Sequence, residues 1–140
     1  MFWKAIAHAT LTSPMPGTRF IAHHGVPILF LDYAGVKHRD EALALIRQTR
    51  ELVADLPRDG TLRTLTHVAG ANFDADVLAA VRELAEHNAP WVRVGAVVGL
   101  SGLMRAVFSA IMHLTGRDLR AFEDLETAKD FLAGVPRSLP

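Results

Sequence analysis

Three side chains of this 140-residue sequence have the types and the chain order of a serine-hydrolase triad. Asp32, His67 and Ser101 each follow a segment rich in apolar or β-branched residues, where the carboxyl ends of parallel strands are expected. A hydroxyl, an imidazole and a carboxylate in contact form a nucleophile, its general base and the group that orients the base. Because that geometry defines the triad, the sequence raises hydrolysis as one candidate function.

The residues around Ser101 do not match a nucleophile elbow. That motif is Gly-x-Ser-x-Gly, whereas this segment reads Gly99-Leu100-Ser101-Gly102-Leu103, with leucine in place of the second glycine. No oxyanion-hole motif is visible in the sequence either. We therefore predict no catalytic residues and no enzymatic activity, and a serine hydrolase is the least favoured of three hypotheses.

The same glycine-rich turn has a second chemical interpretation. Gly99 and Gly102 could present free amide N–H groups to a phosphate or carboxylate at a helix N-terminus. The full P-loop pattern, with its lysine, is absent. We favour the structural alternative, in which glycine allows the helix to approach the sheet closely and Ser101 accepts a hydrogen bond from an exposed N–H.

The seven histidines follow no metal-binding pattern. His23 and His24 are adjacent at a predicted hairpin turn and the others are single, with no His-x-x-x-His pair and no acidic ligand cluster. The chain has no cysteine, which excludes disulfides and thiolate metal sites and suits a reducing compartment. We predict surface histidines, no metal and no cofactor.

Large apolar side chains are the remaining candidates for binding. Methionine and aromatic side chains suit adaptable apolar ligands, and a crevice between helices and sheet would bring several of them together. The same residues at this spacing are also typical of an ordinary core. The candidates are Tyr33, Phe73, Trp91, Met104, Phe108 and Met112.

Hydrophobic periodicity predicts the elements that position these residues. Alternating or β-branched segments predict strands over 18–24, 26–33, 61–68, 91–98 and 119–122. Helical spacing predicts helices over 40–56, from a cap at Asp74 to near Asn88, from the Gly99 turn to Gly116, and from a cap at Asp124 to Gly134. The order β-β-α-β-α-β-α-β-α predicts an α/β fold with a single mixed sheet, its first strand antiparallel, and helices packed on it.

Composition and charge limit the classes of function. The length fits one domain and half of the residues are apolar, enough for a packed core. Fifteen basic residues balance fifteen acidic ones, which disfavours a nucleic-acid partner. Two prolines and a glycine in residues 13–17 predict an N-terminal tail over 1–17 and a domain over 18–140. Without a signal-peptide pattern, we predict a cytoplasmic location.

The apolar run over 91–117 is too interrupted to be a transmembrane segment. A spanning helix needs about 20 mostly apolar residues, whereas only eleven residues separate Arg93 from Arg105 and several of them are glycines. The apolar stripe from Leu100 to Leu114 is nevertheless broader than one sheet face requires. We expect the part around Phe108 and Met112 to meet a second subunit or to act as a mobile lid.

Three pieces of the sequence, HGVPILFLDYAG, HVAGANFDADVLAAVRELAEHNAPWVRVGAVVGLSGL and FEDLETAKDFL, closely resemble small bacterial SpoIIAA-like proteins. The match covers about residues 19 to 132, and the fold of that family is related to STAS and CRAL-TRIO lipid-transfer domains. The resemblance implies either binding of a small apolar molecule beside the sheet or a regulatory interaction module. It also implies an acidic residue more often than histidine at position 67, which argues against a shared triad.

One departure from the resemblance concerns regulation. STAS switches carry a phosphorylatable serine or threonine at the start of the helix after a middle strand. The equivalent segment here is Asp74-Ala75-Asp76, which has no hydroxyl. A phosphorylation switch at that position is therefore not expected.

Together these observations predict a non-catalytic, cytoplasmic binding protein with a STAS/SpoIIAA-like fold. Its ligand would be small and apolar or lipid-like, held in a crevice at the carboxyl edge of the sheet. The alternative is a STAS-like protein-interaction module, acting as a homodimer or with a protein partner. The predicted ligand-binding residues are Asp32, Tyr33, His67, Phe73, Gly99, Ser101, Met104 and Phe108.

Overall fold

A computed structural model describes residues 16–115 and 119–136 of the chain, which form one five-stranded sheet and four helices. The strands are β1 (Gly17–His23), β2 (Val26–Asp32), β3 (Leu62–His67), β4 (Val92–Val98) and β5 (Leu119–Phe122). The helices are α2 (Arg39–Ala54), α3 (Ala75–Asn88), α4 (Gly102–Thr115) and α5 (Leu125–Gly134).

The strands lie in the sheet in the order in which they occur in the chain. β1 and β2 form an antiparallel hairpin, and β2, β3, β4 and β5 are parallel to one another. Parallel neighbours need a crossover connection, and α2, α3 and α4 provide the three that this sheet requires. As a result, β2, β3, β4 and β5 all end at one edge of the sheet.

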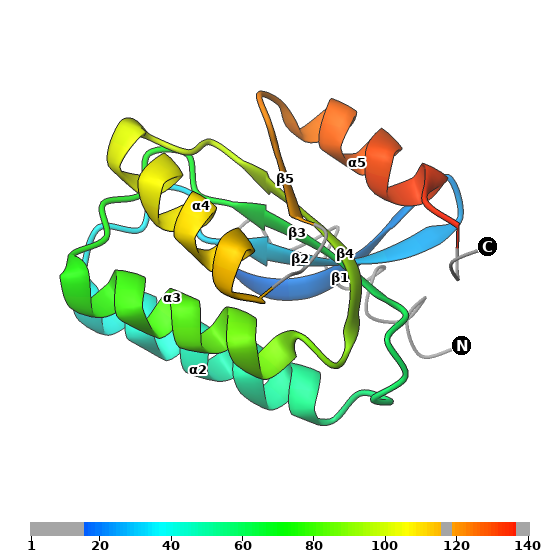
Figure 1. Ribbon diagram of the computed structural model, residues 1–140, viewed down its shortest axis with the longest axis horizontal. Helices are drawn as coiled ribbons and strands as arrows, with labels where there is room; N and C mark the ends of the chain where they lie inside the picture. Colours follow the sequence, from blue (N-terminus) through cyan, green and yellow to red (C-terminus); the bar gives the residue numbers. More distant parts are fainter. Residues whose placement is uncertain (1–15, 116–118, 137–140) are drawn as a thin grey trace.

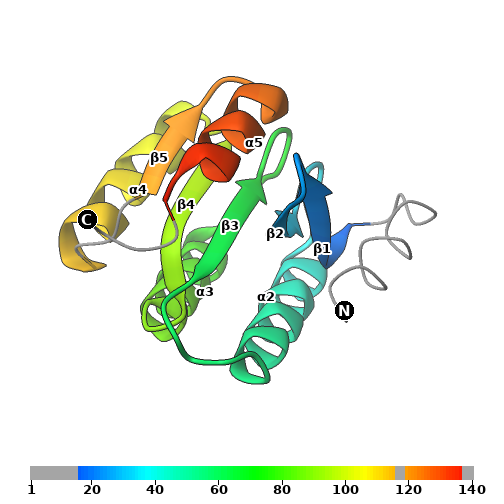
Figure 2. The same ribbon diagram turned by 90° about the vertical axis from the view of Figure 1, so that its right-hand side faces the viewer.

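The helices divide unequally between the two faces of the sheet. Among the helices that the structure describes, α2, α3 and α4 cover one face and α5 covers the other (Figures 1 and 2). Alternate strand residues supply two separate cores, with Leu29 and Leu31 facing α2 and α3 and Ile28 and Phe30 facing α5. A helix on each face explains why β2 is apolar on both sides.

The predicted fold class and element order are confirmed; several boundaries coincide, and the others differ by one or two residues. Asp74 and Asp124 cap α3 and α5 as expected, accepting hydrogen bonds from Val77 N at 2.9 Å and Thr127 N at 2.8 Å. Residues 1–15 of the predicted tail and the predicted helix end at Gly116 lie outside the described residues. Within the described ranges, no helix is long and apolar enough to cross a membrane.

Candidate functional site

A partly open cavity of about 110 Å³ lies between helices α3 and α4 and the sheet. Thr64, Thr66 and Val68 form part of its floor, because residues two apart on β3 and its extension face the same side. The apolar faces of α3 and α4 form the opposite wall. The lining consists of Leu31, Tyr33, Thr64, Thr66, Val68, Phe73, Leu78, Val81, Leu84, Ala85, Asn88, Ala96, Val97, Leu100, Met104, Val107, Phe108, Ile111 and Leu119.

Helix α4 forms one wall of the cavity, but few of its own side chains are buried. Of its residues 102–112, only Met104 and Ile111 are buried. Leu103 is 69% exposed, and Val107 and Phe108, which line the cavity, are half-buried. A helix held by so few buried side chains has a low local stability, and such elements are the ones that move when ligands bind.

Tyr33 contributes its ring to the cavity wall, while its hydroxyl group is bound to helix α2. The phenol oxygen lies 2.5 Å from Thr49 Oγ1 and 3.4 Å from the carbonyl oxygen of Leu45. Thr49 in turn lies 2.5 Å from Thr18 Oγ1 on β1. Burial raises the pKa of Tyr33 to about 12, outweighing the hydrogen bonds to Thr49 and Thr18. The hydroxyl group therefore joins the end of β2 to α2 by hydrogen bonds and is not available to a ligand.

Asp32 and His67 lie on the opposite face of the sheet from the cavity. Asp32 Oδ1 is 3.7 Å from His67 Nδ1, and Asp32 Oδ2 is 3.3 Å from an Arg19 guanidinium nitrogen. The ring of His67 stacks on Phe30 with a centroid separation of 6.3 Å, and the Arg19 guanidinium lies 5.0 Å from the Phe30 ring centroid. Phe30 belongs to the core under α5. Arg19, Asp32 and His67 therefore form a polar cluster around the ring of Phe30.

Ser101 caps helix α4. Its hydroxyl oxygen lies 3.5 Å from the backbone nitrogen of Met104, in the position of an N-cap acceptor. Within the described part of the chain, no hydrogen bond joins Ser101 to His67. The pair of Asp32 and His67 thus exists without the nucleophile that a triad requires, and the geometry needed for a Ser-His-Asp site is not assembled.

Gly99 is required by the path of the chain between β4 and α4. Its φ is +91°, and a Cβ placed on it would lie 2.5 Å from the backbone nitrogen of Ala69. Only glycine tolerates both the left-handed backbone and this close approach to the loop after β3. Gly99 is therefore accounted for by packing, and neither it nor Ser101 lines the cavity.

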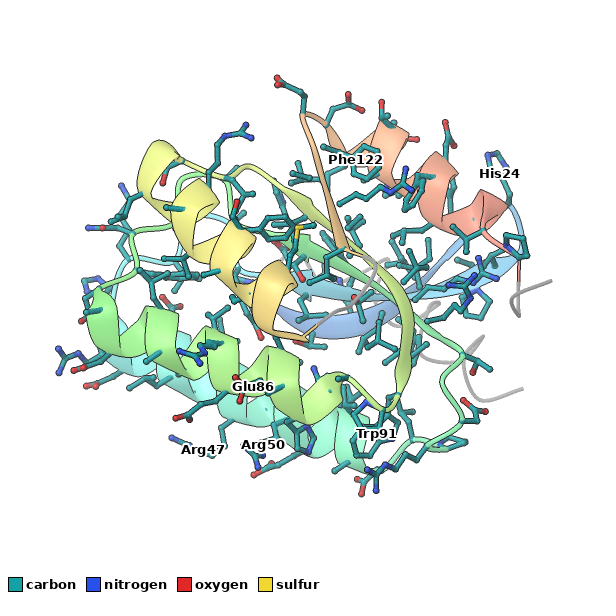
Figure 3. All side chains as sticks on the ribbon, in the orientation of Figure 1. His24, Arg47, Arg50, Glu86, Trp91 and Phe122 are labelled. Carbon is teal, nitrogen blue, oxygen red and sulfur yellow. The ribbon has the colours of Figure 1, made fainter. Side chains whose placement is uncertain are left out.

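The eight predicted ligand-binding residues therefore do not form one site. Tyr33, Phe73, Met104 and Phe108 line the cavity, whereas Asp32, His67, Gly99 and Ser101 do not. Two further crevice candidates are also excluded from its lining. They are Met112 and Trp91. Trp91 lies near the C-terminal end of α3 (Figure 3), where its ring stacks on His87 and its indole N–H donates to the carbonyl oxygen of Leu56 at 3.0 Å.

Sequence reasoning missed the contribution of α3 and β3 to the cavity. Val81, Leu84 and Ala85 line it from α3, and Thr64 and Thr66 line it from β3. In the sequence, the α3 residues belong to a regular buried stripe that any amphipathic helix shows. The alternation of threonine with Arg63, Leu65 and His67 was the available signal for the floor, because it separates the two faces of β3.

Comparison with known proteins gives a likeness of fold. No protein-family model matches the sequence, and no curated protein matches it at a significant level. Two chains of solved structures match it. One is an uncharacterised protein of the DUF3478 family with a SpoIIAA-like fold from Shewanella loihica PV-4, with 14% identity and a TM-score of 0.64 over 86% of this chain and 98% of that chain.

The chain therefore has the SpoIIAA-like α/β fold, with an apolar cavity beside its sheet. The likeness that the three sequence pieces indicate is confirmed for the fold. At 14% identity it carries no ligand and no activity from one protein to the other.

Proposed function

We propose that this chain is a non-catalytic cytoplasmic binding protein for a small apolar ligand, held in the cavity between α3, α4 and the sheet. The cavity is the observation that carries the proposal. Its lining is almost entirely aliphatic and aromatic, with Thr64, Thr66 and Asn88 as its few polar side chains besides Tyr33. Apolar pockets with few polar groups are typical of small-molecule sites.

The size of the cavity defines what it can hold. At about 110 Å³ it is smaller than the roughly 150 Å³ apolar cavity that admits benzene. A small apolar group fits without rearrangement, and a longer lipid-like chain requires α4 to move outward. We expect α4 to be the element that moves, because α3 packs between α2 and α4 and its Asp74 cap is paired with Arg39 of α2.

Binding of indole and of a medium-chain fatty acid, measured by calorimetry, tests this proposal. Both probes are larger than the cavity as it stands, so both should bind wild-type protein with an outward movement of α4, and the Met104 methyl resonance should shift on binding. Val107→Phe fills the cavity from α4 and should abolish binding, whereas Leu103→Phe on the exposed side of the same helix should leave it intact.

The proposal fails if neither probe binds and freshly purified protein carries no apolar molecule in native mass spectrometry. It also fails if Val107→Phe binds as well as wild type, because the ligand would then occupy another place. An unchanged melting temperature of the two variants in the absence of probe separates loss of binding from loss of fold.

A STAS-like protein-interaction module is the second candidate. The SpoIIAA-like fold of the solved neighbour and the exposed Leu103 on α4 favour it. A protein that is empty in native mass spectrometry, and whose complex with a co-purified partner or second copy is lost in Leu103→Asp, would favour this function over ligand binding.

The N-terminus of α3 bears on how such a module could be regulated. Asp74 accepts from Val77 N and pairs with Arg39 at 2.8 Å, and Arg39 also lies 3.0 Å from Asp76. The hydrogen bond from the Val77 N–H, helped by Arg39, holds the pKa of Asp74 below its ordinary value. The Asp74 carboxyl is therefore negatively charged at neutral pH and paired with Arg39.

A further inference from the structure

The hairpin between β1 and β2 turns through an unusual pair of residues. His23 pairs with Val26, which leaves His24 and Gly25 as a two-residue loop. Both have positive φ, +51° and +77°, as the type I′ turn requires. Asn-Gly is the common pair in such turns, and a histidine in the left-handed region is uncommon. Within the described ranges, His24 is the one non-glycine residue with positive φ.

This turn places the two imidazole rings against each other. The ring centroids of His23 and His24 are 4.2 Å apart, with the planes tilted by 58°. The side chain of His24 is 73% exposed, and that of His23 is mostly buried. Packing does not explain the exposed ring, although histidine is one of the few non-glycine residues that are enriched in the left-handed region. An inference from such an outlier to a functional role is reasonable when further groups converge on it.

Helix α5 brings a third group to the same place. Asp130 Oδ1 lies 2.6 Å from His23 Nε2 and 3.4 Å from His24 Nε2, across a separation of more than a hundred residues in the chain. The three ligand atoms all lie within 4.8 Å of one another. Figure 3 shows His24 at the hairpin end beside α5, on the α5 side of the sheet and away from the cavity under α4.

Two imidazole nitrogens and one carboxylate oxygen are a donor set that zinc and neighbouring divalent ions bind. Zn–N and Zn–O bonds are about 2.0–2.2 Å, so donor atoms of a tetrahedral site are roughly 3.3–3.5 Å apart. The separation of 3.4 Å between His24 and Asp130 already matches. The 2.6 Å contact between His23 and Asp130 is a hydrogen bond that must open by somewhat less than 1 Å when a metal replaces the shared proton.

We propose that His23, His24 and Asp130 bind a divalent transition-metal ion of the zinc type. Three protein ligands leave one position of a tetrahedral ion open, and Asp130 is 63% exposed. The ion is therefore exchangeable, and it joins the β1–β2 hairpin to α5.

Zinc calorimetry on the untagged full chain, with the melting temperature measured alongside, tests the site. We expect one zinc ion per chain and a rise in melting temperature that a chelator reverses. His24→Asn keeps a residue suited to the turn, and Asp130→Asn keeps the shape of the side chain. Each should weaken zinc binding by at least about tenfold, the loss that even outer-shell partners of a metal produce.

His38→Asn is the matched control, because His38 is an exposed histidine at the start of α2, away from the hairpin. It should bind zinc as wild type does, and cobalt bound to wild type should show the intense visible bands of a tetrahedral ion. The proposal is wrong if zinc leaves the melting temperature unchanged, or if His24→Asn and Asp130→Asn both bind zinc like wild type. These outcomes are independent of the indole and fatty-acid experiments.

Discussion

The two faces of the sheet differ in how completely their side chains fill the space beneath the helices. Under α5, the side chains of Ile28, Leu65, Val94 and Leu132 are completely buried. Under α3 and α4, the sheet borders a cavity of about 110 Å³. Protein interiors are normally as dense as organic crystals, so an apolar void of this size forfeits contacts that its lining side chains would otherwise make.

The difference follows from how the covering helices are anchored. Helix α5 is short, but Leu132 and Ala128 are fully buried, and Arg63 donates to the carbonyl oxygens of Leu132 and Val135 at its C-terminal end. Those bonds satisfy acceptors that a helix end otherwise leaves open. Among residues 102–112 of helix α4, only Met104 and Ile111 are buried, and Ser101 caps its N-terminus. The α5 face of the sheet is therefore closely packed, whereas the face under α3 and α4 contains unfilled space.

Truncation of a core side chain on each face tests this contrast most strongly. Leu132→Ala on the α5 face should lower the free energy of unfolding by about 2–5 kcal/mol, because a fully packed leucine leaves a new cavity. Met104→Ala should cost about 2 kcal/mol, the low end of the same range, since Met104 already borders empty space and the lost transfer free energy dominates. Urea unfolding of both variants measures the difference. Equal losses would show that the two faces are equally well packed.

The fold was accessible from the sequence because each element carries its own periodic signal. The alternation in β3, the helical spacing in α2 and the caps at Asp74 and Asp124 are local patterns, and one order of elements joins them. The candidate site was only half accessible. Asp32 and Tyr33 are consecutive and were assigned to one site, but neighbouring residues at the end of a strand point to opposite faces.

Contacts between distant elements could not be predicted at all. His23 and His24 gave no metal signal, because their partner Asp130 is on α5 and only the packing of that helix across the sheet brings it to the hairpin. The cavity depends in the same way on the spacing of α3 from α4, which is a property of tertiary packing. Patterns within one element cannot encode such distances.

The ionisation of Tyr33 reports how well water is excluded from its hydroxyl group between the sheet and α2. Its pKa of about 12 in the folded chain compares with the ordinary value of 10.0 expected when the chain is unfolded. Below pH 10 both states hold the phenol proton, and above it the unfolded chain loses the proton first. The free energy of unfolding should therefore fall between pH 10 and about 12, by roughly 2–3 kcal/mol in all.

Tyr33 is the only tyrosine in the sequence, so the near-ultraviolet absorbance of phenolate follows it alone. Folded protein should titrate near pH 12 and urea-unfolded protein near pH 10. Tyr33→Phe should lack this component of the pH dependence, which separates it from the titration of lysines. A folded midpoint close to 10 would mean that water reaches the phenol hydroxyl group beside α2.

Filling the void is the mildest perturbation and the most direct comparison of the two faces. Val81→Leu adds one methylene on the α3 wall of the cavity and should raise the free energy of unfolding by about 0.8 kcal/mol, because the added group enters existing apolar space. Val94→Leu adds the same group to the completely buried α5 face and should destabilise by about 1–3 kcal/mol through overpacking. Opposite signs in urea unfolding are the expected result. Destabilisation by both variants would show that the space beside Val81 closes up in solution, and a cavity that closes in this way cannot hold a ligand unless α4 moves.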